Sequence, residues 1–259
     1  HKLYSAINIF GFAVGLACCI VILIFVRGEL SYDKFVPDNQ HIYRVLATFH
    51  TPDGDAESAT IMGPLGPALA SDFADFEAVT RVRDETNAVK RGDVLFYETV
   101  IYADPTFFQT IPLPLVAGDM ATAIVEPNTV VISEAMARKY FGDADPVGQI
   151  MTFDGNKPMR VTGILRDLPA TSHLAIDFLS NYRSATYNLG LDELETQWYN
   201  GNHYVYVRLK AGVAPESIEA QFPAFEARHF PDATLNTGPV KGGDLVTLSL
   251  QRFTDVHLH

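Results

Sequence analysis

LYSAINIFGFAVGLACCIVILIFV, residues 3–26, is a run of 24 residues without one charged side chain. A helix of this length is about 36 Å long, and the hydrocarbon core of a bilayer is about 30 Å thick. A cleaved signal peptide is the main alternative, but its apolar core is usually about 7–15 residues long and ends at small residues. Here the most apolar part, residues 20–26, comes last. The stretch therefore predicts a retained transmembrane helix over residues 1–28.

Small residues lie along one face of this predicted helix. The residues that follow one another at spacings of three or four are Ser5, Asn8, Gly11, Gly15 and Cys19. Gly11 and Gly15 also form a GxxxG motif, and small residues allow helices to approach closely in lipid. Glycine is common in membrane helices in general. The pattern nevertheless favours a span that packs against other helices.

The rest of the chain is acidic and has no cysteine. The whole chain carries 19 basic and 31 acidic residues, a formal net charge of −12, and 47% of its residues are hydrophobic, as in a folded protein. A negative body has no cationic surplus to neutralise phosphates, which argues against binding of nucleic acid. Both cysteines, Cys18 and Cys19, lie in the predicted span. The body must therefore be stabilised by its core and not by disulfides.

Two β-α-β units are predicted, one at each end of the body. The first consists of strands over 41–51 and 77–89 with a short helix over 63–76 between them, and a third strand is expected after it over 94–102. The second consists of a strand over 204–209, a helix that begins at Pro215 and a strand over 246–251. In the strand 204–209, Val205, Val207 and Leu209 alternate with polar or amphipathic residues. This alternation predicts a half-buried strand.

The middle of the body has a different pattern. A short apolar strand over 130–132 precedes Ser133, a good N-cap, and a helix that ends at Gly142. Asp154-Gly155 is a strong hairpin signal between strands over 150–153 and 159–164. The segment 184–198 is polar and predicts a helix or a loop. The middle thus predicts an α+β subdomain inserted between two β-α-β units that rejoin each other.

Catalytic signatures are absent from the sequence. It contains no GxxxxGK[ST] phosphate loop, no HExxH and no GxSxG. The histidines are scattered, and the exception is His257 with His259, an i, i+2 pair that we interpret as a surface pair. The cluster of Asp72, Asp75 and Glu77 predicts a solvated face. We therefore assign no catalytic residue, no cofactor and no metal site, and predict that the chain is not an enzyme.

Aromatic residues are the remaining candidates for function. Those that could line a groove for an apolar or peptidic ligand are Tyr97, Tyr102, Phe107, Phe108, Tyr204 and Tyr206. Large aromatic side chains more often fill cores. Core packing is therefore the favoured interpretation for most of them.

Short segments spread along most of the chain form an ordered set. They are INIFG (7–11), ELSYDKF (29–35), IYRV (42–45), YADPTFF (102–108), AGD (117–119), VVISEAMARKYFG (130–142), DPVGQ (145–149), VTGI (161–164), DLP (167–169) and SHL (172–174). This set resembles the first span and the periplasmic core domain of MacB/FtsX-type ABC transporter permeases. The resemblance is densest over residues 1–45 and 100–180 and weaker over 180–259.

The resemblance implies an α+β fold in which a transmembrane helix precedes an extracytoplasmic domain of two subdomains. The implied parts are the transmembrane helix (1–28), the first half of a porter-like subdomain (29–103), an inserted α+β subdomain (104–200) and the second half of the porter-like subdomain (201–259). Three further membrane helices are expected beyond His259. The residues from about 29 onward are expected in the periplasm, on the outer side of the cell inner membrane.

The function implied by the resemblance is that of a permease subunit that couples ATP-driven motion to efflux or to a periplasmic partner protein. The implied partners are an ABC ATPase on a separate domain or subunit, a second permease half in a homodimer or pseudo-dimer, and membrane lipid. Such a relay needs a stiff connection between span and domain, which we expect over 27–35. The alternative is a single-pass membrane-anchored extracytoplasmic binding or sensor domain, and a membrane-tethered hydrolase is a more distant third.

Overall fold

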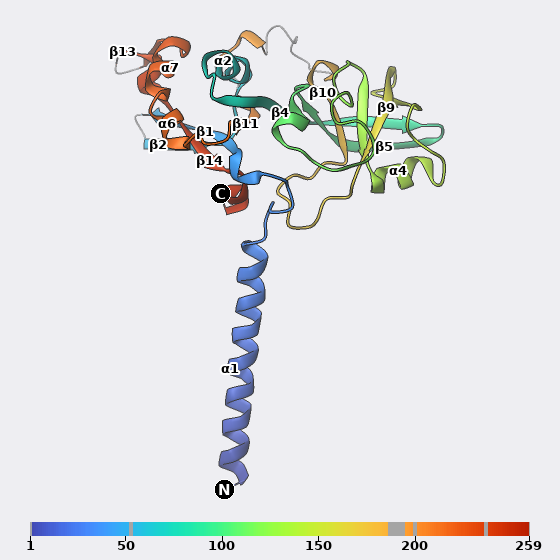
Figure 1. Cartoon of the computed structure of the whole chain (residues 1–259), viewed down its shortest axis with the longest axis vertical. Helices are drawn as coiled ribbons and strands as arrows, with labels where there is room; N and C mark the ends of the chain where they lie inside the picture. Colours follow the sequence, from blue (N-terminus) through green and yellow to red (C-terminus); the bar gives the residue numbers. More distant parts are fainter. Residues whose placement is uncertain (1, 52–53, 186–194, 199–200, 236–237, 259) are drawn as a thin grey trace.

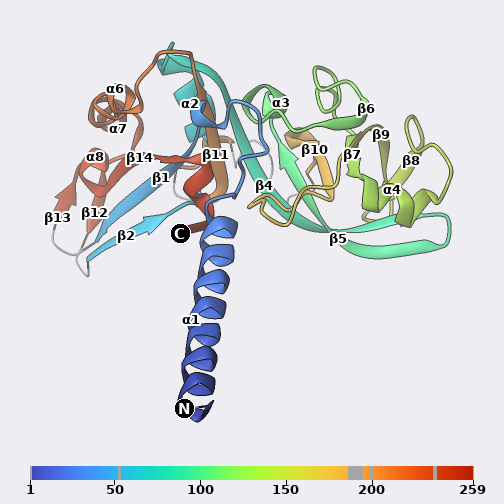
Figure 2. The same ribbon diagram turned by 60° about the horizontal axis from the view of Figure 1, so that its bottom comes forward.

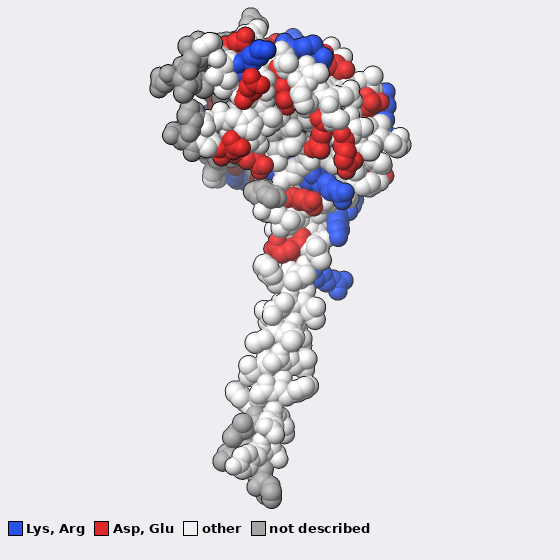
Figure 3. Space-filling view, turned by 90° about the vertical axis from the view of Figure 1, so that its left-hand side faces the viewer, with Lys and Arg blue, Asp and Glu red and all other residues white. Residues whose placement is uncertain are grey.

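The computed structural model describes residues 2–51, 54–185, 195–198, 201–235 and 238–258. Helix α1 (Lys2–Glu29) extends from the folded domain as a stalk (Figures 1 and 2). Its segment Asn8–Glu29 has a mean hydropathy of 3.0 and is not buried against the domain. Figure 3 shows the stalk as an almost uncharged surface up to the base of the domain, where charged side chains begin. The predicted N-terminal helix is therefore present, with the length and composition of a membrane span.

The domain beyond α1 is mixed α+β, as predicted. Its strands are β1 (Ile42–Thr51), β2 (Gly54–Ser58), β3 (Ile61–Met62), β4 (Phe76–Arg91), β5 (Val94–Ala103), β6 (Leu115–Gly118), β7 (Thr129–Ser133), β8 (Ile150–Phe153), β9 (Lys157–Leu165), β10 (Phe178–Asn181), β11 (Gly201–Leu209), β12 (Ala233–Leu235), β13 (Gly238–Val240) and β14 (Val246–Arg252). Its helices are α2 (Leu65–Asp72), α3 (Phe107–Thr110), α4 (Glu134–Phe141), α6 (Pro215–Glu219), α7 (Phe222–His229) and α8 (Gly242–Leu245), with 3-10 turns η1 (Asn39–His41), η2 (Tyr182–Ser184) and η3 (Phe253–Leu258). Apart from the β12–β13 hairpin, these strands belong to one 12-stranded sheet.

Four strands at one end of the sheet form an antiparallel layer in the order β14-β1-β11-β4. One crossover joins β1 to β4 through α2, and another joins β11 to β14 through α6 and α7. In each case a strand of the other unit lies between the two joined strands, which is the split β-α-β arrangement. The three helices pack on the face of the layer turned away from α1 (Figure 1), where they bury Leu65, Leu69, Phe222 and Phe225.

Over residues 204–209, strand β11 alternates between buried and partly exposed residues, as predicted, except at Tyr206. Val205, Val207 and Leu209 belong to the core under the helices, as the alternation predicts. On the other face Tyr206 is only 3% exposed, because it packs in a second core with Val36 and Phe253. Both of these residues come from segments far from β11 in the sequence. The pattern of the strand alone therefore does not indicate its second cover.

The rest of the sheet closes into a six-stranded barrel. From β4 the pairing runs through β5, β10, β7, β9 and β8, and β8 returns to β4 at Val89↔Phe153 and Lys90↔Thr152. The side chains that fill the barrel and its α4 opening are Val89, Val100, Tyr102, Val130, Ile132, Tyr140, Phe141, Met151, Phe153, Met159, Val161 and Phe178. Strand β4 belongs to both the layer and the barrel, so the two parts are joined by one continuous strand.

Local signals in the middle segment form as predicted. The Ser133 hydroxyl accepts a hydrogen bond from the Met136 amide at 3.2 Å and caps α4, and Gly142 ends the helix with φ 59°. Asp154 and Gly155 turn the β8–β9 hairpin with φ 48° and 81°. These positive angles are what the Asp-Gly signal provides. The predicted helix or loop over 184–198 lies largely outside the described residues.

A buried polar cluster connects the layer to the barrel. The Arg81 guanidinium on β4 lies over the Tyr182 ring, 4.0 Å from its centroid, and the Tyr182 hydroxyl is 2.8 Å from Nε2 of His203 on β11. His203 is fully buried. Burial, together with the charges of Arg81 and Arg83, lowers the pKa of His203 to about 4. The imidazole is therefore neutral in the folded domain across the physiological range.

We expect acid to destabilise the domain through His203. Because the pKa of His203 is about 4 in the folded chain and that of a solvent-exposed histidine is 6.5, the unfolded chain binds the proton first as the pH falls. Stability from this group is complete above about pH 7 and is lost towards pH 4, by about 2–3 kcal/mol. Urea unfolding of the wild type and of His203→Gln at pH 7.5 and pH 4.5 measures it. An equal loss in both proteins would contradict the assignment.

Candidate functional site at the membrane-proximal junction

The connection between α1 and the domain is anchored at one buried residue. After Glu29 the chain turns through residues 30–36, and Asp33 within this linker is completely buried. Its φ of 56° lies in the left-handed region, which Asp tolerates better than most residues. The Asp33 amide donates a hydrogen bond to the Thr171 carbonyl at 2.8 Å. The linker therefore attaches to the loop between β9 and β10, which belongs to the barrel.

His173 completes this attachment. The Asp33 carboxylate accepts hydrogen bonds from the His173 amide at 3.1 Å and from the ring Nδ1 at 2.7 Å. The ring Nε2 lies 3.0 Å from the Tyr206 hydroxyl. Burial raises the pKa of Tyr206, so the phenol keeps its proton and can donate it to Nε2. We call this Asp33–His173–Tyr206 chain the clamp, because it joins the linker, the barrel loop and the sheet of the layer.

The last 3-10 turn packs against the same place. Phe253, fully buried at the start of η3, contacts the His173 ring edge-to-face with centroids 4.7 Å apart. At the other end of η3, His257 stacks on Tyr32 at 4.0 Å, and its Nε2 is 3.5 Å from the carboxylate of Glu29, the last residue of α1. Figures 1 and 2 place the C-terminal end beside the top of α1. Three segments distant in sequence thus meet where the stalk enters the domain.

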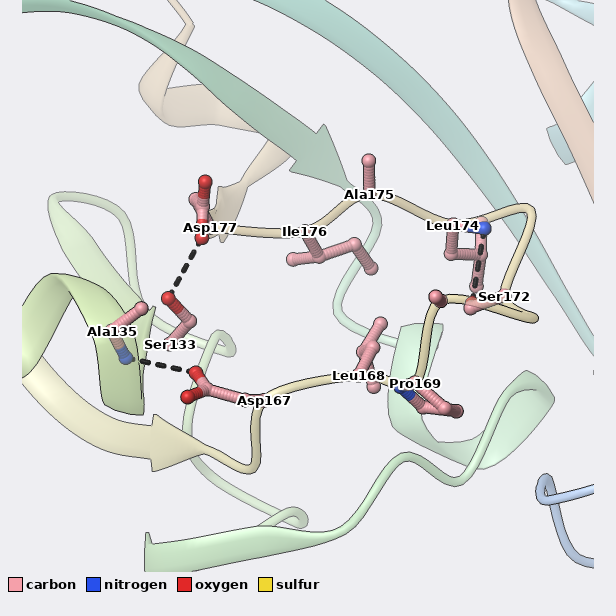
Figure 4. A pocket seen from close by; sticks show the side chains of 11 residues that line it. Ser133, Ala135, Asp167, Leu168, Pro169, Ser172, Leu174, Ala175, Ile176 and Asp177 are labelled. Atoms are coloured by element: carbon pink, nitrogen blue, oxygen red, sulfur yellow. Dashed lines mark hydrogen bonds between the residues drawn. The ribbon is translucent and has the colours of Figure 1, made fainter.

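A cavity of about 370 Å³ lies beside the clamp, between the barrel loop and the start of α4. Its polar groups bind one another: Ser133 Oγ donates to Asp177 at 2.8 Å, and the Ala135 amide donates to Asp167 at 2.8 Å (Figure 4). Burial opposes ionisation of Asp167, but the hydrogen bonds from Arg138 and Ala135 hold its pKa below the usual range. These contacts attach the loop that contains His173 to the barrel. The polar residues of this cavity therefore have a structural role.

Most of the sequence-based candidates have structural roles. Tyr102, Phe107, Phe108 and Tyr206 are buried in cores, as the core interpretation predicts, whereas Tyr97 is 76% exposed. Asp72, Asp75 and Glu77 are exposed. The surface interpretation is wrong for His257, whose side chain is only 9% exposed, and His259 lies outside the described residues. No group of three metal-ligating side chains occurs among the described residues.

Gly11 and Gly15, on the helix face of small residues, are not packed against another described segment. A Cβ added at Gly11 or Gly15 would meet no atom within 4 Å. The packing of this span against other helices therefore stays a prediction. The linker expected as a stiff connection, 27–35, does contain the clamp residue Asp33.

Sequence reasoning did not single out the residues of the clamp. Asp33 and His173 occur in the segments ELSYDKF and SHL, but they are 140 positions apart, and no spacing rule joins them. Charge patterning gives no signal either, because Asp33 is one acidic residue among 31. The only signal was the presence of both residues in the ordered set of segments.

The architecture is an apolar helix with the composition of a membrane span, attached to a split β-α-β layer with a barrel built on one of its strands. Residues 5–225 match the MacB-like periplasmic core domain family, and the chain belongs to this family. Its relatives are components of ABC transporter permeases, and the helix and the periplasmic-type domain are those of an inner-membrane protein with an extracytoplasmic domain.

Solved structures share the fold. A domain assigned to a permease protein from Porphyromonas gingivalis is 24% identical and covers 84% of this chain and 92% of its own, with a TM-score of 0.69. The periplasmic region of MacB from Actinobacillus actinomycetemcomitans is 13% identical and covers 89% of this chain and 96% of its own, with a TM-score of 0.56. No curated protein matches the chain.

Proposed function

We propose that this chain is part of an ABC transporter permease and that its domain transmits movement of α1 to the periplasmic side. The observation that carries the proposal is the clamp. Asp33 follows the end of α1 by only four residues and is tied by two hydrogen bonds to His173 of the barrel loop. A rigid connection of this kind converts a shift or tilt of the helix into a rotation of the domain.

The proposal includes partners that supply and receive the movement. ATP hydrolysis takes place on a separate ABC ATPase domain or subunit, in keeping with the lack of phosphate-loop motifs in this sequence. A second permease half forms a homodimer or pseudo-dimer with this one, and a periplasmic protein receives the movement. In this proposal residues 29–103 and 201–259 form the porter-like subdomain and residues 104–200 form the inserted one, whose barrel is completed by β5 and the end of β4 from the first. Residues from about 29 onward are periplasmic.

A flexible insertion tests the relay. Four Gly-Ser residues placed after Arg27, two residues before the end of α1, leave the clamp intact but separate it mechanically from the rest of the helix. We expect the coupling between ATPase turnover and transport in the assembled transporter to fall about tenfold or more, within the range of usual coupling energies. The thermal unfolding of the domain should not change, because the inserted residues lie outside its core.

The matched control is the same insertion after Gly212. This residue lies in an exposed turn between β11 and α6, with φ 83° and no atom within 4 Å of an added Cβ. It should preserve both folding and coupling. Unchanged coupling after the Arg27 insertion, or failure of the full-length protein to bind any ABC ATPase, would favour the alternative of a membrane-anchored binding or sensor domain.

A further inference from the structure

A second cavity, of about 320 Å³, shares Leu174, Ala175 and Ile176 of the His173 loop with the first. Its volume lies in the range of small-molecule sites, about 300–1,000 Å³. Its walls are mainly apolar and come from β4, β5, β11, the barrel loop and η3: Val82, Ile101, Leu174, Ile176, Tyr204 and Val256. The face of the layer that borders it is the one from which α1 descends (Figure 1). The cavity thus lies on the membrane side of the domain.

One buried cation lines this apolar cavity. Arg44 on β1 is only 6% exposed and lies between Tyr206 and Gln251 of the neighbouring strands. Its Nε donates a hydrogen bond to Oε1 of Gln251 at 2.9 Å, and it also hydrogen-bonds the Tyr206 hydroxyl. Both partners are uncharged. Among the described residues, no carboxylate forms an ion pair with Arg44.

A buried guanidinium with no carboxylate in direct contact is unusual, since buried charges are normally paired. The buried carboxylate of Asp33 is linked to Arg44 only through His173 and Tyr206. Arginine carries five N–H donors in a planar fork that matches carboxylate and phosphate groups. No nitrogen of Arg44 is both buried and without a partner, so the N–H groups that Gln251 and Tyr206 do not use are open to the cavity. The group that best completes the site is therefore an oxyanion.

The other charged group on the cavity wall is Asp84 of β4. Its side chain is exposed and also borders a neighbouring cavity, so solvent screens its charge. Both ring nitrogens of His173, which also lines the wall, are engaged in the clamp. Arg44 is therefore the dominant charge in the buried part of the cavity, and Asp84 opposes an anion only at the exposed part.

We propose that this cavity binds a single-chain amphiphile with an oxyanion head group, taken from the outer surface of the bilayer. The head group pairs with Arg44, and the chain lies against the apolar wall formed by β4, β5 and the barrel loop. The bilayer is the source because the cavity lies on the side of the domain to which the exposed apolar helix α1 is attached. This binding is a property of the domain itself and holds whether or not the domain couples to an ATPase.

Binding of radiolabelled laurate to the full chain in phosphatidylcholine nanodiscs, with empty nanodiscs as the reference, tests the proposal. We expect saturable binding of one laurate per chain. Arg44→Gln, which can keep a polar contact to Gln251, should weaken it about tenfold or more, as loss of a charge-assisted hydrogen-bonded pair does. The matched control Arg252→Gln removes an exposed arginine from the neighbouring strand and should leave the affinity unchanged. Asp84→Asn should tighten binding.

Two further comparisons separate the outcomes. Ala175 is exposed and lines this cavity, whereas Ala170 on the same loop lines only the other one. Ala175→Trp should block laurate and Ala170→Trp should not, which decides the matter even if Arg44→Gln fails to fold. Equal affinity of laurate in wild type and Arg44→Gln, or equal affinity of dodecanol and laurate, would overturn the proposal. Displacement of laurate by inorganic phosphate alone would also overturn it, by indicating a site for free anions.

Discussion

Asp104→Ala is expected to lower the free energy of unfolding by about 3–5 kcal/mol, which is the cost of leaving a buried charge without its partner. Asp104 accepts three hydrogen bonds from Arg81: from the amide at 2.8 Å, from Nε at 2.9 Å and from Nη2 at 2.8 Å. The Arg81 side chain is 6% exposed. Burial opposes its charge, but the bonds and charge of Asp104 outweigh this effect and raise the pKa of Arg81.

The remaining partners of Arg81 do not replace this carboxylate. Nη1 donates to the Gly63 carbonyl at 3.2 Å, and Glu195 is at 4.0 Å from Nη2, too far for a direct hydrogen bond. Urea unfolding of the purified chain measures the loss. The control is Asp72→Ala, which removes an exposed carboxylate paired with Arg228 and His229 and should cost about 1 kcal/mol or less.

A second variant distinguishes the loss of charge compensation from a general intolerance of change at this position. Replacing both partners with apolar residues, Arg81→Met with Asp104→Leu, should cost less than Asp104→Ala alone, because no charge then stays buried. If Asp104→Ala costs no more than Asp72→Ala, the Arg81–Asp104 pair is not the main connection between layer and barrel.

The elements of this fold were predictable wherever the local pattern also determines the tertiary contacts. Strand β4 was expected over 77–89 and occupies Phe76–Arg91, and α4 begins after the predicted N-cap Ser133. The helix expected over 63–76 is shorter, Leu65–Asp72, because Phe73 adopts an extended backbone and packs into the core with Phe222. Tertiary packing overrides the local preference there.

Closure of the barrel was less predictable. It depends on two residue pairs between β4 and β8, and nothing in either strand indicates the other as its partner. The short strands β6 and β10 were also missed, because four residues establish no period and no Asp-Gly hairpin signal adjoins them, as it does β8. Their places are fixed by neighbours from distant parts of the chain. Long-range pairing of this kind leaves no signal in a single sequence.

The clamp also joins residues that no pattern in the sequence connects. Breaking it is the second change for which we expect a large effect. Asp33→Ala should lower the free energy of unfolding by about 3–4 kcal/mol, because it leaves the His173 amide and ring N–H buried without an acceptor. His173→Ala should cost a similar amount, since it leaves the Asp33 carboxylate buried and removes the contact with Phe253. In a double-mutant cycle measured by urea unfolding, the two should couple by about 2 kcal/mol. Additive effects would contradict a direct interaction.

The decisive test of the clamp in transport is a matched pair of conservative changes in the segment between α1 and β1. Asp33 and Asp38 both have a left-handed backbone, with φ 56° and 53°, so that Asn fits equally well at either position. They differ in their surroundings: Asp33 is buried against His173, whereas Asp38 is 61% exposed and pairs with Arg208 at 3.1 Å.

Asp33→Asn weakens the clamp with little change in shape, and in the assembled transporter it should reduce coupling between ATPase turnover and transport about tenfold. Asp38→Asn should not, although it changes the same charge five residues away. Because backbone, charge and chain position are matched, a loss confined to Asp33→Asn assigns the transmission to the contact with His173. Equal effects of the two variants would instead place it in the segment between α1 and β1 as a whole, and no effect of either would separate the clamp from transport and leave it a purely structural contact.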